Sequence, residues 1–345
     1  MGQLCTRNDT SFFKGDAALR VMGSIGAVLD AVNQPDDGNR WTRDTSLAEQ
    51  SAWPDVSVIV PVFNDEIRLH KCIRSLLGQT YTGAVEIIVV DNGSPGGLES
   101  LKAEFPTVAF LNDERIGSYN ARNTGIAHAR GEVLAFTDSD CDPTREWLQT
   151  GVQALLREGG NTIVGGRIAV FPVNTQRPRI SELYDIATGF RQGIYVKWHG
   201  SSATGNLLAY RSTFDAVGRF NGRLRSGGDG EWCQRAARAG YRLIYEDGAV
   251  IRHPARTTHE EIIARVRRTE AGRRDLFPSW YGCIREVLRC LAPPVIETYM
   301  LLWGQGRNLK RHHKILVFAY AWQVRWISAW ERLKFQFDTS KSPRA

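Results

Sequence analysis

The chain has 345 residues, of which 42% are hydrophobic and 23% charged, and its formal net charge is +7 at pH 7. This length and composition suffice for one large globular domain or two small ones. Six cysteines are scattered along the chain without a CxxC pair, which argues against a structural zinc site and against a disulfide framework.

Residues 1–52 are predicted to form an N-terminal extension. They are mixed and polar in composition, with one amphipathic helical pattern at 17–32. The first residues do not contain a basic segment followed by an apolar stretch, so we expect no secretory signal and a protein that stays in the cytoplasm.

The pattern changes at Val56, where predicted strands and helices begin to alternate. The run VSVIVPVF (56–63) is β-branched and continuous, as in a strand buried on both faces of a parallel sheet. A helical pattern follows at 66–79, and further strand patterns occur at 85–94, 108–113 and 132–140. This alternation predicts an α/β domain at 53–275, with a mainly parallel sheet flanked by helices.

Polar side chains follow three of the predicted strands. Asn64 comes after the first strand, Asp91 after the second, and Asp138 and Asp140 after the fourth. Ligands of open α/β sheets bind outside the carboxyl ends of the strands, so we expect these side chains at one rim of the sheet.

The stretch LAFTDSDCDP (134–143) places Asp138 and Asp140 on either side of a serine. Carboxylates in this arrangement can offer hard oxygen ligands to Mg²⁺ or Mn²⁺, although an Asx-rich turn or a helix cap would use the same residues. The sequence has no GxGxxG or GxxxxGK[ST] motif, which argues against dinucleotide-binding and P-loop proteins. A nucleotidyltransferase would need a glycine-rich, basic loop where this chain has PVFND (61–65).

Five motifs, in order, resemble those of the family 2 inverting glycosyltransferases with the GT-A fold. They cover about residues 53–260 and read VSVIVPVFND, VEIIVVDNGS, GSYNARNTGIAHARGEVLAFTDSDCDP, TGNLLAYRSTFDAVGRFN and GGDGEWCQRAARAGYRLIY. The resemblance implies a nucleotide-diphospho-sugar donor, a divalent metal ion and an inverting single displacement that transfers a hexosyl group.

The resemblance further implies a nucleobase pocket at the ends of the first two strands. Pro61, Val62 and Asn64 would line this pocket, and Asp91 would accept a hydrogen bond from an imide or amide N–H of the base. A solvated salt bridge is the alternative explanation of Asp91 and equally of Arg122. Asn92 stands where the family has a second aspartate, with no evident consequence for the site.

The diphosphate and the metal ion would lie beside this pocket. Arg122 and Asn123 would flank the nucleotide, because a guanidinium is a fixed cation suited to phosphate. Asp138 would contact the ribose or the sugar. Asp140 would coordinate the metal ion that bridges the phosphates and acts as a Lewis acid. His253, at another apparent strand end, resembles a histidine that completes this shell in some members; a purely structural histidine is the alternative.

Displacement at an anomeric carbon requires a base for the acceptor hydroxyl. In the family this base is the aspartate of a Glu-Asp pair that opens a helix, and the matching stretch SGGDGEW assigns the role to Asp229, which could also be a helix cap. Gly228 replaces the glutamate and leaves Glu231 as the candidate neighbour. Arg235 would orient Asp229 or reach a phosphate. Asn206 would lie near the donor sugar, although a turn before a strand would use the same residue.

Residues 276–345 are predicted to form a basic, tryptophan-rich tail of amphipathic helices. Residues 280–345 hold 11 Lys and Arg against 4 Asp and Glu, together with five of the ten tryptophans. The apolar stretches are too short to span a bilayer, but such residues are typical of helices at a membrane surface, and the tail resembles those that attach glycosyltransferases with lipid-linked acceptors. Packing on the catalytic domain and a dimer interface are the alternatives. We expect no nucleic-acid partner.

Together these patterns predict a metal-assisted glycosyltransferase that uses a nucleotide-sugar donor and a lipid-linked or polysaccharide acceptor in cell-envelope polysaccharide biosynthesis. We expect a peripheral protein on the cytoplasmic side of the plasma membrane, or otherwise a cytoplasmic one. The alternative is a catalytically inactive relative that binds a nucleotide-sugar or glycan at the membrane. Gly228 favours this alternative, whereas Asp138, Asp140 and Asp229 argue against it.

Overall fold

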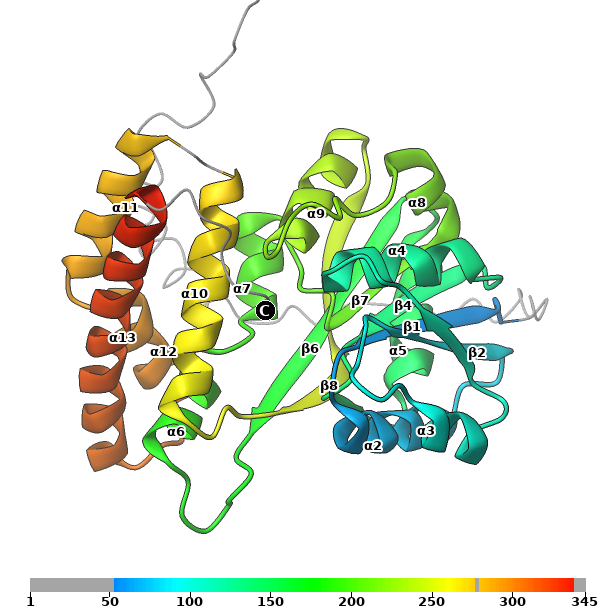
Figure 1. Cartoon of the computed structure of the whole chain (residues 1–345), viewed down its shortest axis with the longest axis horizontal. Coiled ribbons are helices and arrows are strands. Elements are labelled where there is room, and N and C mark those ends of the chain that lie inside the picture. The colour runs from blue at the N-terminus through cyan, green and yellow to red at the C-terminus, as the bar shows by residue number, and fades with distance from the viewer. Residues whose placement is uncertain (1–52, 277–278, 338–345) are drawn as a thin grey trace, which may run out of the picture. The chain divides into compact units, whose positions relative to one another are not determined.

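The computed structural model describes residues 53–276 and 279–337, and its central feature is one mixed sheet of eight strands (Figure 1). The extension predicted at 1–52, with its helix at 17–32, lies outside the described residues. The strand order is β3-β2-β1-β4-β7-β6-β8-β5. The strands are β1 (Val56–Val62), β2 (Val85–Asp91), β3 (Ala109–Asn112), β4 (Val133–Thr137), β5 (Asp142–Pro143), β6 (Thr162–Phe171), β7 (Asn206–Tyr210) and β8 (Arg242–Pro254).

The first half of the sheet is parallel, as the sequence predicts. β1 pairs in parallel with β2 and β4, and β2 with β3, so that Asp91 is in register with both Val62 and Asn112. The second half is mixed because β7 runs antiparallel to its neighbours β4 and β6. A buried strand is equally apolar in either direction, so the hydrophobic pattern does not reveal this reversal.

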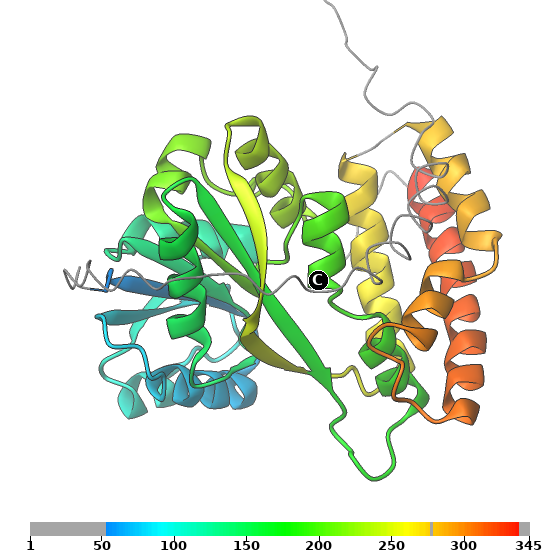
Figure 2. The ribbon, with the colours of Figure 1, turned by 180° about the vertical axis from the view of Figure 1, so that it is seen from behind.

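Helices cover both faces of the sheet (Figures 1 and 2). One face is covered by α2 (Glu66–Leu77), α3 (Glu99–Glu104) and α5 (Trp147–Glu158). The other is covered by α4 (Ser118–His128), α8 (Arg211–Val217) and α9 (Gly228–Arg238). Successive residues of a strand point to opposite faces, and β1 places Val58 in the first core and Ile59 in the second. Burial on both sides therefore explains why every residue of β1 except Ser57 is apolar.

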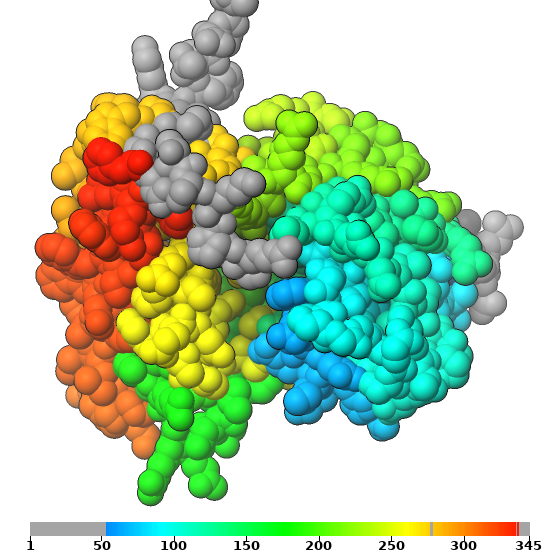
Figure 3. Space-filling model, in the orientation of Figure 1, coloured from blue at the N-terminus to red at the C-terminus, as the bar shows by residue number. Residues whose placement is uncertain are grey.

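The remaining helices follow β6 and β8. They are α6 (Ile180–Thr188), α7 (Gln192–Ile194), the π-helical turn η2 (Tyr195–His199), α10 (His259–Leu276), α11 (Trp280–Leu291), α12 (Val295–Leu302) and α13 (Arg311–Phe337). α13 packs on α6 through Val317 and on α10 through Val324; Figure 3 shows α10 in yellow beside the orange and red tail helices. Among the described helices, none combines the length and the apolar character needed to cross a bilayer.

Candidate active site

The loops after β1 and β2 meet where the sequence predicts a nucleobase pocket. Pro61 and Val62 are buried in β1, and Asn64 has a left-handed backbone with φ of 50°. The Asn64 N–H donates to Ser94 Oγ at 2.8 Å, and the Ser94 N–H donates to Asp91 Oδ1 at 2.9 Å. Ser94 therefore ties the two loops together. A surface pocket between them is lined by Asn64, Asp65, Ile67, Ser94, Pro95 and Leu98.

Asn92 organises the loop that leads into α4. Its Nδ2 donates to the carbonyl oxygens of Asp113 at 2.9 Å and Arg115 at 2.7 Å, and its Oδ1 accepts from the Gly117 N–H at 2.7 Å. An ionised aspartate has no N–H to donate and could not make the first two bonds. The replacement of the family's aspartate by Asn92 therefore has a structural consequence that the sequence did not show, because the amide anchors this loop.

Arg122 links α4 to the end of β4. Its guanidinium is buried and forms an ion pair with the Asp138 carboxylate. Its Nε atom has no hydrogen-bond partner among the described residues. Because a buried cation is costly without compensation, the contact with Asp138 fixes the position of both side chains.

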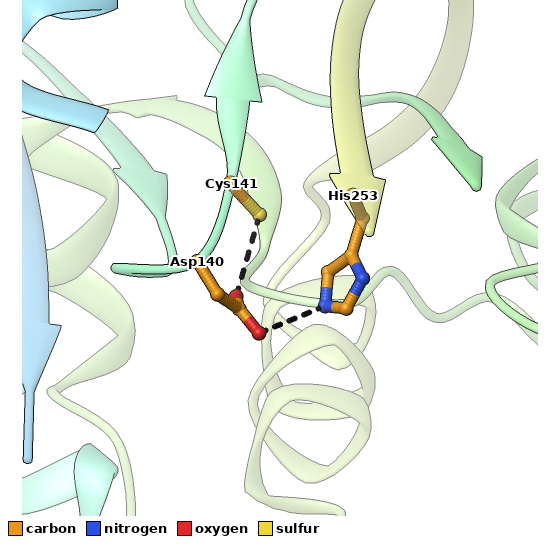
Figure 4. Close-up of side chains that lie close together, drawn as sticks. All are labelled: Asp140, Cys141 and His253. Atoms are coloured by element: carbon orange, nitrogen blue, oxygen red, sulfur yellow. Dashed lines mark hydrogen bonds and ion pairs between the residues drawn. The ribbon is translucent and has the colours of Figure 1, made fainter. Parts of the chain in front are cut away.

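Asp140, in the connection after β4, and His253, near the end of β8, lie together (Figure 4). His253 Nε2 is 3.3 Å from Asp140 Oδ2, and Cys141 Sγ is 3.9 Å from Asp140 Oδ1. The other imidazole nitrogen, Nδ1, is 2.7 Å from the carbonyl oxygen of Pro254, which can only accept a hydrogen bond. Nδ1 therefore carries a proton, and Nε2 is the nitrogen that faces the carboxylate.

The electrostatics of this pair favour charged groups. Burial alone would raise the pKa of the Asp140 carboxyl, but His253, Arg68 and Arg256 outweigh it and hold this pKa well below its usual range. Burial would lower the pKa of the His253 imidazole, yet the carboxylate of Asp140 raises it above its ordinary value. In its neutral form, with the proton on Nδ1, the imidazole offers the lone pair of Nε2 beside the Asp140 carboxylate, and this donor set fits a divalent metal ion that displaces the Nε2 proton.

A buried ion cluster lies behind His253. Asp185 on α6 is fully buried and accepts hydrogen bonds from the guanidinium groups of Arg256, at 2.9 Å, and Arg265, at 2.9 Å. Both guanidinium groups are within 6.0 Å of the ring centre of Phe190, which in turn lies 4.7 Å from the His253 ring. Phe190 has a φ of 37°, a conformation that is costly for a bulky residue and that the surrounding contacts maintain.

Asp229 occupies the first turn of α9 and is partly exposed. Its Oδ1 accepts hydrogen bonds from the Gly230 N–H at 2.9 Å and from the Tyr119 hydroxyl at 3.2 Å. Removal from water raises the pKa of the Asp229 carboxyl, while these hydrogen bonds and the charge of Arg122 oppose the rise. A carboxyl with a raised pKa is suited to accept a proton from a hydroxyl.

Comparisons with known proteins bear on this arrangement. Residues 57–227 match the family described as Glycosyl transferase family 2. Glycosyltransferase AglE of Haloferax volcanii is 37% identical over 212 residues, which are 60% of this chain and 69% of that protein. The chain belongs to glycosyl transferase family 2. The pre-mycofactocin glycosyltransferase of Mycobacterium tuberculosis is 31% identical over 219 residues, or 61% of this chain and 45% of that protein.

The fold of this family 2 member is similar to that of a solved glycosyltransferase. The mannosyltransferase PcManGT from Pyrobaculum calidifontis, in complex with GDP-Man and Mn²⁺, superposes with a TM-score of 0.55. The match is 18% identical in sequence and covers 92% of this chain and 97% of that one. The predicted GT-A fold class and the predicted glycosyltransferase family are thereby confirmed.

Three predicted donor-binding residues of this glycosyltransferase do not fit that role. Asn206 is fully buried, and its side chain bonds Trp147 and the carbonyl groups of Arg167 and Ala249. Both polar groups of the Asn123 side chain bond the backbone of Phe220. Arg235 bonds Glu231 and the carbonyl groups of Val217 and Arg219, so it holds the α8–α9 connection rather than Asp229. These internal hydrogen bonds commit the three side chains to holding the protein structure rather than to a donor.

Sequence reasoning missed Tyr119 and the Asp185 cluster. Asp185 lies in a helical stretch of mixed composition, and nothing local shows that it faces two arginines about 70 and 80 residues further along the chain. Tyr119 lies within the quoted motif GSYNARN, but its neighbour on α9 is 109 residues away. Such pairings depend on how helices pack, and no spacing rule along the chain reports them.

Proposed function

We propose that this glycosyltransferase moves a sugar from a nucleoside-diphosphate sugar to an acceptor hydroxyl, with inversion at the anomeric carbon. The observation that carries the proposal is that one helix, α4, contacts both carboxylates. Arg122 of α4 pairs with Asp138, and Tyr119 of α4 donates a hydrogen bond to Asp229 at 3.2 Å. A donor-side carboxylate and a candidate base are thus held by the same helix, which suits a displacement in which donor and acceptor must be aligned.

The donor class and the metal ion are inferred from the related fold. PcManGT was solved with GDP-Man and Mn²⁺, and here Asp140 and His253 would hold a divalent ion. An imidazole nitrogen beside a carboxylate suits Mn²⁺ better than Mg²⁺, which prefers oxygen ligands. When bound, the ion would stabilise negative charge on the departing diphosphate. Asn64, which lines the pocket beside Ser94, would contact the nucleobase there. Asp91, which is buried behind Ser94 at the end of β2, would accept a hydrogen bond from the base.

Asp229 would act as the general base. As the acceptor oxygen forms its bond to the anomeric carbon, Asp229 takes the hydroxyl proton. The bond from that carbon to the diphosphate oxygen breaks, and its electron pair leaves with the diphosphate. Attack opposite the leaving group inverts the configuration. The raised pKa of Asp229 makes this carboxylate a stronger base than an exposed aspartate.

We propose further that the acceptor is a lipid-linked or polysaccharide molecule reached at a membrane surface. α11 exposes Tyr281, Ile284 and Leu288 at helical spacing, and α13 exposes Trp322, Trp326 and Trp330, while Val317 and Val324 face the protein. A second apolar face on a packed helix, beside exposed arginines and lysines, suits the interface of an anionic bilayer.

Basic side chains near η2 suit a phosphate-bearing acceptor. Partial removal from water lowers the pKa of His199, and the positive charges of Arg191 and of Arg289 on α11 lower it further. Positive charge contributed by both the catalytic domain and the tail would attract an anionic headgroup. A lipid-linked acceptor with a phosphate group would satisfy both the charge here and the apolar face of the tail.

A binding and hydrolysis panel tests the proposed function. UDP-, GDP- and dTDP-sugars are added to the purified protein with Mn²⁺, with Mg²⁺ and with EDTA, and the melting temperature and the release of nucleoside diphosphate are measured. We expect one nucleotide class to raise the melting temperature only with metal and to be hydrolysed slowly. No response to any donor in the presence of either metal would contradict the proposal.

A further inference from the structure

Gly228 stands where the family has the glutamate of its Glu-Asp pair, and the structure shows what occupies the space instead. A Cβ atom built on Gly228 would lie 2.8 Å from Cε2 and 2.9 Å from Cζ of the Tyr119 ring. Real Cβ atoms do not approach other atoms this closely, and the backbone of α9 cannot retreat without moving Asp229. The Tyr119 ring and a side chain at position 228 therefore exclude each other.

The Tyr119 hydroxyl also caps the N-terminus of α9. The residue before the helix, Gly227, has no side chain to accept a hydrogen bond from the first N–H groups. The Tyr119 oxygen accepts from the Gly228 N–H at 2.9 Å and from the Asp229 N–H at 3.3 Å. With both lone pairs engaged, its single proton is left for Asp229 Oδ1, which lies 3.2 Å away.

We propose that Tyr119 is a positioning residue for the base, which replaces the missing glutamate by holding the Asp229 carboxylate from the facing helix α4. The inference rests on the proposed role of Asp229. Tyr119 is buried, its ring packs on Phe220, and Arg122 one turn later on α4 lies over it at 5.7 Å. Because Arg122 pairs with Asp138, helix α4 holds the donor-side carboxylate and the base in one rigid unit. The missing side chain at Gly228 therefore makes room for the Tyr119 ring, and it does not indicate that the enzyme is inactive.

The groups around Asp229 make a pH profile informative. Arg122 from α4 contributes a positive charge that lowers the pKa of Asp229. Burial raises the pKa of the Cys233 thiol on α9 to about 12, and burial likewise raises the pKa of the Tyr119 hydroxyl, so both keep their protons near neutral pH. The remaining contact, the Thr204 backbone N–H, does not titrate. Among these groups, Asp229 alone changes charge on the acidic side of neutrality.

The test compares Tyr119→Phe with the unsubstituted enzyme. The donor with the largest thermal shift is used, and the release of its diphosphate is followed as a function of pH. Tyr119→Phe removes a hydrogen bond that favours the charged carboxylate, so the acidic limb of kcat should move to higher pH by roughly one unit, while KM for the donor stays within about twofold. Tyr81→Phe, which loses a buried hydroxyl bonded to Pro54 far from Asp229, is the matched control and should leave the profile unchanged.

The variant Asp229→Asn distinguishes failure of the Tyr119 inference from failure of the proposed role of Asp229 as the base. If Asp229→Asn is inactive and Tyr119→Phe keeps the original profile, the role of Tyr119 is refuted although the base is correct. If Asp229→Asn remains active, the proposed function fails at the base itself. If Tyr119→Phe folds poorly, Gly228→Glu is tested instead. Gly228→Glu alone should lose activity because its side chain meets the Tyr119 ring. The double variant Gly228→Glu with Tyr119→Ala should be at least about tenfold more active than Gly228→Glu alone. Equal activity of those two variants would also overturn the proposal.

Discussion

Asp140 and His253 form the pair of side chains on which the proposed metal site depends. They lie at the ends of β4 and β8, more than 100 residues apart in the chain, and contact each other at 3.3 Å. The hydrogen bond from Nδ1 to Pro254 fixes the ring so that Nε2 faces the carboxylate. Such a second hydrogen bond orients histidines that bind metal ions, so the geometry favours a ligand over a purely structural histidine.

Substitution of His253 tests this pair. In His253→Ala the Asp140 carboxylate loses its partner ligand, so the Mn²⁺ concentration that gives half-maximal diphosphate release should rise by at least about tenfold. A metal titration of activity measures this concentration. His128→Ala, an exposed histidine that bonds only its own helix, is the matched control. An unchanged Mn²⁺ requirement in His253→Ala would remove His253 from the site.

The positions of several site residues could be predicted from the sequence because they depend on the local strand pattern. Asp91 ends β2, and Asn64, Asp138 and Asp140 come shortly after β1 and β4, so the strand pattern alone places them at one rim of the sheet. The prediction that Asn206 contacts the donor sugar used the same kind of argument but does not fit the structure. The Asn206 side chain instead bonds Trp147 and the backbone of β6. The polarity of a residue is visible in the sequence, whereas its hydrogen-bond partners are set by packing.

At the scale of elements, strands and their alternating helices were predictable, whereas the pairing order beyond β4 was not. Each buried strand is recognisable in the sequence by its apolar residues. The sequence of β7 does not show that this strand lies antiparallel between β4 and β6. The packing of α13 on α6 and α10 also had no unique signal, because a face buried on protein and a face buried in lipid have the same composition.

The contact between α10 and α13 supplies a prediction at this scale. Glu270 is buried and pairs with Arg332 at 3.1 Å, while Ser328 Oγ donates to its other oxygen at 2.7 Å. Glu270→Leu would leave the buried Arg332 unpaired, so the free energy of unfolding should fall by about 3–5 kcal/mol. Urea unfolding measures this loss.

The double variant Glu270→Leu with Arg332→Met provides the comparison. It replaces both charges by apolar side chains, so it should be more stable than Glu270→Leu alone. Equal stability of Glu270→Leu and the natural protein would show that α13 is not held on α10 through this pair.

For the whole molecule, the tail is proposed to bring the active site to a membrane. Replacing Trp322, Trp326 and Trp330 by serine removes exposed side chains and leaves the packed face of α13 intact, so the melting temperature should change little. Flotation with vesicles that contain anionic lipid should fall by about tenfold or more. Leu77→Ser with Leu156→Ser, two exposed apolar residues of the catalytic domain, is the control and should float normally. Undiminished flotation of the tryptophan variant would contradict the membrane role of this face.

The central claim for the molecule is that Asp229 removes a proton during sugar transfer at a donor site built around Asp138 and Asp140. The most direct test is to measure diphosphate release and donor-induced thermal shift together in Asp229→Asn. We predict that release falls by about 10²–10⁴-fold while donor binding stays within a few fold, because the base acts only as the acceptor attacks. Release at the natural rate, with the donor bound as before, would contradict the account.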